Sequence, residues 1–139
     1  MRGVGAWFGL KKRRTTSTRR QRRRVDVAHY HTHREQARAL VHERLAYWNA
    51  HYGCSYGRVA IRDQRTRWGS CSSKQNLNFN YRIVFLPQHL ADYIIVHELC
   101  HLLELNHGPQ FWSHVARTMP AYEAHILELR ALNMHTLGA

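Results

Sequence analysis

The chain has 139 residues, a length that fits one compact domain and leaves no room for a second enzymatic one. Its hydrophobic fraction of 44% supports a folded core, and no apolar stretch is long enough to cross a membrane. The formal net charge of +12 is concentrated at one end, because residues 1–25 carry ten Lys or Arg and no acid, while residues 26–139 carry eleven basic and nine acidic side chains. The basic character therefore belongs to the N-terminal segment.

The segment Lys11–Arg24 is rich in arginine, with Thr and Ser between the arginines and almost no apolar residue. Such a segment cannot bury enough surface to offset the loss of conformational entropy, so it is predicted to be disordered in isolation. The expected organisation is a basic, disordered tail over residues 1–33 and a folded domain over residues 34–139. Clustered arginine neutralises phosphates, which predicts weak, salt-sensitive binding of Lys11–Arg24 to nucleic acid or to an anionic membrane surface. A solubilising extension is the alternative.

Two features favour a cytoplasmic location. The apolar run at residues 6–10 is too short for a secretory signal, although an Arg-rich, acid-poor start also fits a mitochondrial presequence. The three cysteines, Cys54, Cys71 and Cys100, are odd in number and form no C-x-x-C pair. This usage is typical of a reducing compartment, and we expect buried free thiols.

A helix and then a small sheet are expected after the tail. Apolar residues three to four apart predict an amphipathic helix that ends by Gly53, which is free to take the left-handed capping conformation: Ala37, Leu40, Val41, Leu45 and Trp48. Three short runs separated by polar turns predict an antiparallel sheet: Val59–Ile61, Trp68–Cys71 and Leu77–Phe79. Residues 81–86 fit either a strand or a helical turn.

Three helices complete the pattern. Pro87 fits the first position of a helix whose apolar spacing continues to Leu105. Pro109 opens the next helix, and Pro120 separates it from the last one. The predicted fold class is therefore α+β, with a small antiparallel sheet packed on a helix and further C-terminal helices.

The segment His97-Glu98-Leu99-Cys100-His101 contains the motif H-E-x-x-H inside an apolar helix. Residues four apart lie one above the other, about 6 Å along the helix axis, so His97 and His101 can converge on one ion. Neutral imidazole is a preferred ligand of Zn²⁺, and a carboxylate beside the first ligand can take a proton from a zinc-bound water. The motif predicts a zinc site with Glu98 as that carboxylate.

A third ligand has to come from beyond the helix. On an unbroken helix His107 would lie about 9 Å beyond His101 and on the other side. Asn106 tolerates the left-handed conformation, and Pro109 prevents simple continuation of the helix, so the chain can turn and bring His107 back. Glu123 and Glu128 are the rival third ligands, since some zinc hydrolases use a downstream Glu.

The spacing of ten between His97 and His107 is that of the metzincin pattern, in which a Gly stands where this chain has Glu104. Because of that difference, the chain is not assigned to the metzincins. Glu104 is either an acid that supports a ligand or an ordinary exposed helix residue.

Several further motifs resemble the YgjP-like metallopeptidases, which are related to the SprT and WLM zincins: Ile61-Arg62-Asp63, Arg67-Trp68-Gly69-Ser70-Cys71-Ser72, Leu77-Asn78-Phe79-Asn80, Asp92-Tyr93, Asn106-His107 and Phe111-Trp112, together with H-E-x-x-H. The resemblance covers about residues 34–132. It implies a minimal zincin-like fold with a sheet over the active-site helix and one Zn²⁺ per chain on His97, His101 and His107. It also implies that Glu98 is the catalytic acid.

Two other residues have two interpretations each. Trp68 either packs in the core or lines the substrate cleft. Asp92 either forms a hydrogen bond with a metal-binding imidazole or stabilises the start of its helix. His114 and Tyr122 are candidate oxyanion stabilisers. An exposed strand edge near Arg67–Ser72 would suit pairing with an extended peptide.

Three functions follow from these patterns. The first is a zinc metallopeptidase that hydrolyses peptide bonds of a peptide or protein substrate with Glu98 as general base. The second is a metal-dependent nucleotide pyrophosphohydrolase on the same site, because an activated water can also attack a phosphoanhydride. The third is a nucleic-acid-associated SprT-like protease anchored by the Arg-rich tail, or a binding protein whose zinc is structural.

Overall fold

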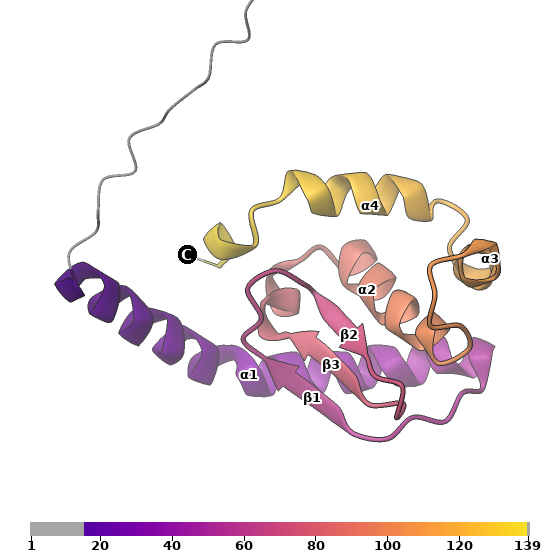
Figure 1. Cartoon of the computed structure of the whole chain (residues 1–139), viewed down its shortest axis with the longest axis horizontal. Helices are drawn as coiled ribbons and strands as arrows, with labels where there is room; N and C mark the ends of the chain where they lie inside the picture. The colour runs from indigo at the N-terminus through magenta and orange to yellow at the C-terminus, as the bar shows by residue number, and fades with distance from the viewer. Residues whose placement is uncertain (1–15, 139) are drawn as a thin grey trace, which may run out of the picture.

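The computed structural model describes residues 16–138, in which two helices run along one side of a three-stranded sheet (Figure 1). The elements in chain order are helix α1 (Thr16–Tyr52), strands β1 (Val59–Arg62), β2 (Gly69–Cys71) and β3 (Leu77–Asn80), 3-10 helix η1 (Tyr81–Phe85), helices α2 (Gln88–His101), α3 (Pro109–Thr118) and α4 (Tyr122–Ala131), and 3-10 helix η2 (Met134–Thr136). The predicted α+β class is confirmed.

The second half of α1 is the amphipathic helix that the spacing predicts. Its apolar stripe is buried at Ala37, Val41 and Leu45. The helix stops at Tyr52, and Gly53 follows with φ +63° and donates its N–H to the carbonyl of Asn49. The left-handed glycine ends the helix because it satisfies a terminal carbonyl without a Cβ clash.

The first half of α1 differs from the expected disorder, because residues 16–33 are helical and only residues 1–15 of the predicted tail lie outside the described range. Arginine and glutamine have good helix propensity, and a helix propagates cheaply from a half that is already packed. Two contacts fix it: Tyr30 Oη donates to the carbonyl of Ile61 (3.0 Å), and His29 Nδ1 lies 2.8 Å from Tyr81 Oη. The packed second half of α1 and these two contacts thus keep the arginine-rich segment helical, although its own side chains are mostly exposed.

The sheet is mixed, with the strand order β1-β3-β2, so the expected all-antiparallel pairing is wrong for one pair. β2 and β3 form the antiparallel pair, with Gly69 opposite Phe79. β1 runs parallel to β3, because the segment between β1 and β2 crosses to the far side of β3. Central β3 buries Leu77 and Phe79 completely.

Helix α2 is apolar on nearly all sides, because it lies between the sheet, α1 and the C-terminal helices. It ends at His101, four residues before the predicted end at Leu105. The N–H groups of Leu103 and Glu104 both reach the carbonyl of Cys100 (3.0 Å each), which tightens the last turn. Asn106 has no positive φ, so the chain turns back to His107 without the left-handed conformation that this residue tolerates.

Helix α4 lies over α2 on the side away from α1 (Figure 1) and has no fully buried residue. Among α1, α3 and α4, which all contact α2, α4 alone has no fully buried residue. Within residues 16–138, no helix combines the length and apolarity that a membrane crossing requires.

Candidate metal centre and active site

Three histidines meet at the C-terminal end of α2. The Nε2 atoms of His97, His101 and His107 form a triangle with sides of 3.0–3.2 Å. His97 and His101 come from consecutive turns of α2, and His107 comes from the loop before α3. Because α2 ends at His101, the chain needs only a short loop to bring His107 back, and the three predicted ligands converge.

The triangle fits a metal ion. Nitrogen ligands about 2.1 Å from a tetrahedrally coordinated zinc lie about 3.4 Å apart, close to the observed spacing. The Nδ1 of His101 lies 3.1 Å from the carbonyl of Glu104. A carbonyl only accepts, so Nδ1 carries the proton and the Nε2 lone pair points into the triangle. Glu104 therefore supports a ligand through its backbone carbonyl.

Burial favours the neutral form of the imidazoles of His97 and His101. Burial first, and then the neighbouring His101 and His107, lower the pKa of His97 to about 3. Burial is also the main cause that lowers the pKa of His101. Neutral imidazole is the form that binds a metal, so the site is prepared for an ion at neutral pH.

Glu98 lies beside the triangle in a largely apolar place. It is only 4% exposed, and its Oε2 has no hydrogen-bond partner among the described residues. Burial raises the pKa of Glu98 to about 8, and the charge of Arg67 opposes the shift. A buried carboxyl with an unused oxygen and a pKa near neutrality is suited to pass a proton.

Aromatic side chains from α3 hold the triangle from the other side. The ring of Phe111, which is fully buried, stacks on His101 with centroids 4.4 Å apart. Trp112 stacks on His107 at 6.0 Å and on Tyr122 at 5.0 Å. These contacts restrain His107, which lies in a loop and is not positioned by α2 itself.

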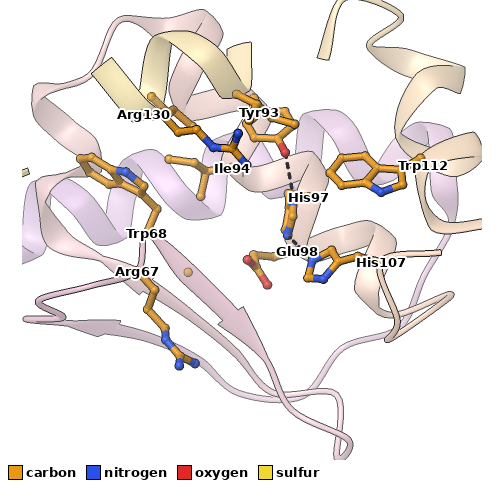
Figure 2. A pocket seen from close by; sticks show the side chains of 12 residues that line it. Arg67, Trp68, Tyr93, Ile94, His97, Glu98, His107, Trp112 and Arg130 are labelled. Atoms are coloured by element: carbon orange, nitrogen blue, oxygen red, sulfur yellow. Dashed lines mark hydrogen bonds between the residues drawn. The ribbon is translucent and has the colours of Figure 1, made fainter. Parts of the chain in front are cut away.

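Tyr93 lies at the site, although the sequence analysis assigns it no role of its own. Its Oη lies 3.1 Å from Nδ1 of His97, as the dashed line in Figure 2 shows. When Nε2 of His97 carries the lone pair, Nδ1–H donates to this phenol, which orients the ring. The sequence spacing could have indicated this contact, because Tyr93 precedes His97 by four residues and lies on the same helical face.

Gly69 is a second such residue, on edge strand β2. A Cβ at this position would lie 3.0 Å from Cγ of Glu98 and 3.0 Å from the carbonyl of Asn78. Only glycine lets β2 approach the carboxylate this closely. The backbone of β2 is thereby placed next to the reacting centre.

A pocket of about 430 Å³ opens in front of His97 and Glu98 (Figure 2). Trp68, Ile126 and Leu129 form its apolar wall, and Arg67 and Arg130 also line it. Trp68 packs partly on the core and partly lines the pocket, so both interpretations of this residue hold.

The remaining candidates lie elsewhere. Asp92 makes a two-pronged pair with Arg44 on α1 (2.6 and 2.9 Å), so it joins two helices and contacts no ligand imidazole. His114 and Tyr122 are not among the pocket-lining residues. Glu128 lies 2.8 Å from His89, and neither it nor Glu123 belongs to the histidine triangle.

Two solved metallopeptidase zymogens share the fold. Abylysin of Pyrococcus abyssi is 24% identical with a TM-score of 0.57, over 65% of this chain and 90% of that one. Jannalysin of Methanocaldococcus jannaschii is 26% identical with a TM-score of 0.51, over 68% of this chain and 91% of that one. No curated protein matches the chain.

The fold is thus shared with these two metallopeptidase zymogens, and the histidine cluster could hold a metal ion. The family follows from the sequence match: the model described as YgjP-like, metallopeptidase domain, matches residues 6–132. The chain therefore belongs to the YgjP-like metallopeptidase family.

Proposed function

We propose that the protein is a zinc-dependent peptidase in which His97, His101 and His107 hold one zinc ion and Glu98 is the general base. The observation that carries the proposal is the triangle of Nε2 atoms, 3.0–3.2 Å on each side, with a buried carboxylate next to it. Three protein ligands leave one position open, as in catalytic rather than structural zinc sites.

Zinc bound at the triangle would polarise the scissile carbonyl and make a water more acidic. Glu98 takes a proton from the attacking water and later delivers it to the leaving amine. Its largely apolar surroundings raise its affinity for the proton, so the group can hold the proton between the two steps. Arg67 opposes this shift and keeps the carboxylate form accessible.

The substrate is proposed to bind as an extended strand along the outer edge of β2. Among the strands of residues 16–138, β2 pairs only with β3, so its other backbone edge is open there to add a strand. Gly69 lets β2 lie close to Glu98, and Trp68 and Arg67, just before it in the chain, line the pocket. A peptide paired there would pass the catalytic carboxylate.

The test combines metal content with hydrolysis. One zinc is expected at the triangle, and His107→Ala is expected to lose it together with activity. Glu98→Gln is expected to keep that zinc and to lose about 10²–10⁴-fold in turnover, the usual contribution of a positioned general base. Zinc bound with full activity in Glu98→Gln would refute the role of this residue.

The same assay separates peptides from phosphoanhydrides. The proteins are offered peptide libraries and, in parallel, nucleoside triphosphates. Peptide cleavage that depends on Glu98 and His107 supports the proposal. A strict requirement for a nucleotide without peptide cleavage would instead assign the site to a pyrophosphohydrolase.

A second candidate function, polyanion binding, rests on a basic hollow of about 790 Å³ beside the first half of α1. Six arginines and two aspartates line it, together with Thr16 and His135: Arg19, Arg20, Arg22, Arg23, Arg65, Arg82, Asp26 and Asp63. We propose that this hollow, together with Lys11–Arg24, binds nucleic acid weakly. Replacing Arg19, Arg20 and Arg23 by Gln should reduce retention on DNA and flatten its salt dependence while peptide hydrolysis persists. Unchanged retention would reject this accessory role.

A further inference from the structure

A second cluster of metal-binding side chains lies outside the catalytic centre, between α2 and α4. His89 comes from the start of α2, and His125 and Glu128 come from α4. One ligand atom from each lies within 4.8 Å of the others, and Nε2 of His89 is 2.8 Å from Oε2 of Glu128. We propose that His89, His125 and Glu128 form a second site for a divalent transition-metal ion such as zinc.

The donor set and its geometry suit such an ion. Two imidazoles and one carboxylate are a ligand set that zinc takes in proteins, with remaining positions filled by water. His125 and Glu128 are three residues apart, so they lie on the same face of α4. The side chains of His89 and Glu128 are 48% and 52% exposed, which leaves the ion a direct path from solvent.

His125 supplies a second, independent observation. Its Nδ1 atom is buried and has no hydrogen-bond partner within the described part of the chain. Ring contacts with His89 (5.4 Å) and Tyr93 (6.2 Å) hold the imidazole there, yet no residue between 16 and 138 forms a hydrogen bond that would select its tautomer. Coordination would fix the tautomer and the orientation of the ring.

The second site is separate from the catalytic one. His89 precedes His97 by eight residues, which is about 12 Å along the axis of α2. One ion cannot serve both clusters at that distance. Glu128, a rival third ligand for the catalytic zinc on sequence grounds, belongs to this second cluster.

Binding there would fasten α4 to α2. No residue of α4 is fully buried, while Ile126, Leu129 and Arg130 of this helix form one wall of the active-site pocket. An ion shared by His89, His125 and Glu128 ties that wall to the helix that carries the catalytic residues. The consequence is a pocket whose rigidity depends on a second metal.

The experiment is zinc titration of the full chain, with stoichiometry checked by native mass spectrometry. The wild type is expected to bind two zinc ions, and the double variant His89→Asn, Glu128→Gln only one, with the second affinity lowered at least about tenfold. The control is His42→Asn, Glu43→Gln, which removes an exposed histidine and glutamate from α1 and should still bind two.

Thermal unfolding gives a readout that does not use activity. In His107→Ala, which weakens the catalytic site, zinc should still raise the melting temperature, because a ligand that binds only the folded state stabilises it. Adding His89→Asn and Glu128→Gln to that variant should abolish the rise. If the wild type binds one zinc that His107→Ala removes, or if the double variant still binds two, the second site does not exist. One zinc that is lost only in the double variant would instead refute the catalytic site.

Discussion

Individual side chains of the centre owe their chemistry to where they are buried. Glu98, at 4% exposure, has an unused oxygen, whereas the carboxylates of Asp92 and Asp63 are paired with Arg44 and Arg82. Burial without a partner makes the Glu98 carboxyl hold its proton more tightly, so its pKa is raised. Carboxyl groups of this protein therefore stand in two kinds of environment, one without a partner beside the histidines and the others in ion pairs.

The raised pKa of Glu98 predicts how the stability of the metal-free protein depends on pH. The folded carboxyl keeps its proton up to about pH 8, whereas the unfolded one releases it near 4.5. Its contribution is fully present below the unfolded pKa and is lost as the pH rises through that window. Urea unfolding with a chelator present should show the wild type losing stability relative to Glu98→Gln as the pH rises. A difference that stays constant with pH would contradict this.

Tyr93→Phe tests whether the phenol orients the first zinc ligand. The substitution removes the 3.1 Å contact with His97 and leaves the ring in place. Zinc affinity at the catalytic site, measured by chelator competition, is expected to fall about 10–100-fold, the usual effect of losing such a partner. Tyr47→Phe, on an exposed part of α1, is the control and should change nothing. Equal affinity in both variants would remove the role of Tyr93.

At the scale of elements, α2 organises the molecule. Its start carries His89, its middle Tyr93 and its end the H-E-x-x-H motif. The sheet and α1 cover two of its sides, and α3 and α4 cover the others, so nearly every residue of the helix is buried. The positions of His97, Glu98 and His101 therefore depend on how firmly the neighbouring elements hold α2.

The pair between Arg44 of α1 and Asp92 of α2 is one such attachment. Their side chains are 13% and 8% exposed. Asp92→Ala leaves a buried guanidinium without its partner and is expected to cost about 3 kcal/mol of the free energy of unfolding. Arg38→Ala, which removes a pair with Glu35 whose side chains are 41% and 67% exposed, should cost less than about 1 kcal/mol. Equal losses in urea unfolding would show that burial of the pair does not matter.

Across the whole molecule, the C-terminal end of the described chain contacts the first half of α1 at His29. Nε2 of this residue lies 3.1 Å from the carbonyl of Gly138, and its ring stacks on Phe85 at 5.2 Å. The first half of α1 thus joins the body through a few contacts around residues 29 and 30. Beyond them, exposed arginines continue the helix away from the sheet (Figure 1).

Amide hydrogen exchange can test this attachment. In the wild type, residues 24–33 should be protected, because helical hydrogen bonds there are fixed by the anchor. Tyr30→Ala removes the bond to Ile61 and the ring contact with Tyr81, so protection should drop in this segment and persist over residues 37–52. Tyr47→Ala is the matched control on the same helix. Absence of protection already in the wild type would support the disorder that composition alone predicts.

The sequence by itself determined the elements whose signals are local. The 3–4 spacing of Ala37, Val41 and Leu45 and the glycine after the helix sufficed for the second half of α1, because each signal lies within a few turns. The motif of His97, Glu98 and His101 sufficed to place two imidazoles together on one helical face with a carboxylate beside them. His107 followed from spacing and a break in the pattern.

Only the tertiary structure decided the features that depend on distant neighbours. The parallel pairing of β1 with β3 requires a crossover that no strand signal encodes. The helical state of residues 16–33 depends on an anchor to residues 61 and 81, and the approach of Gly69 to Glu98 depends on a strand packing on a helix. Local propensity carries no information about such partners, since the free energy comes from contacts formed only after the chain has folded.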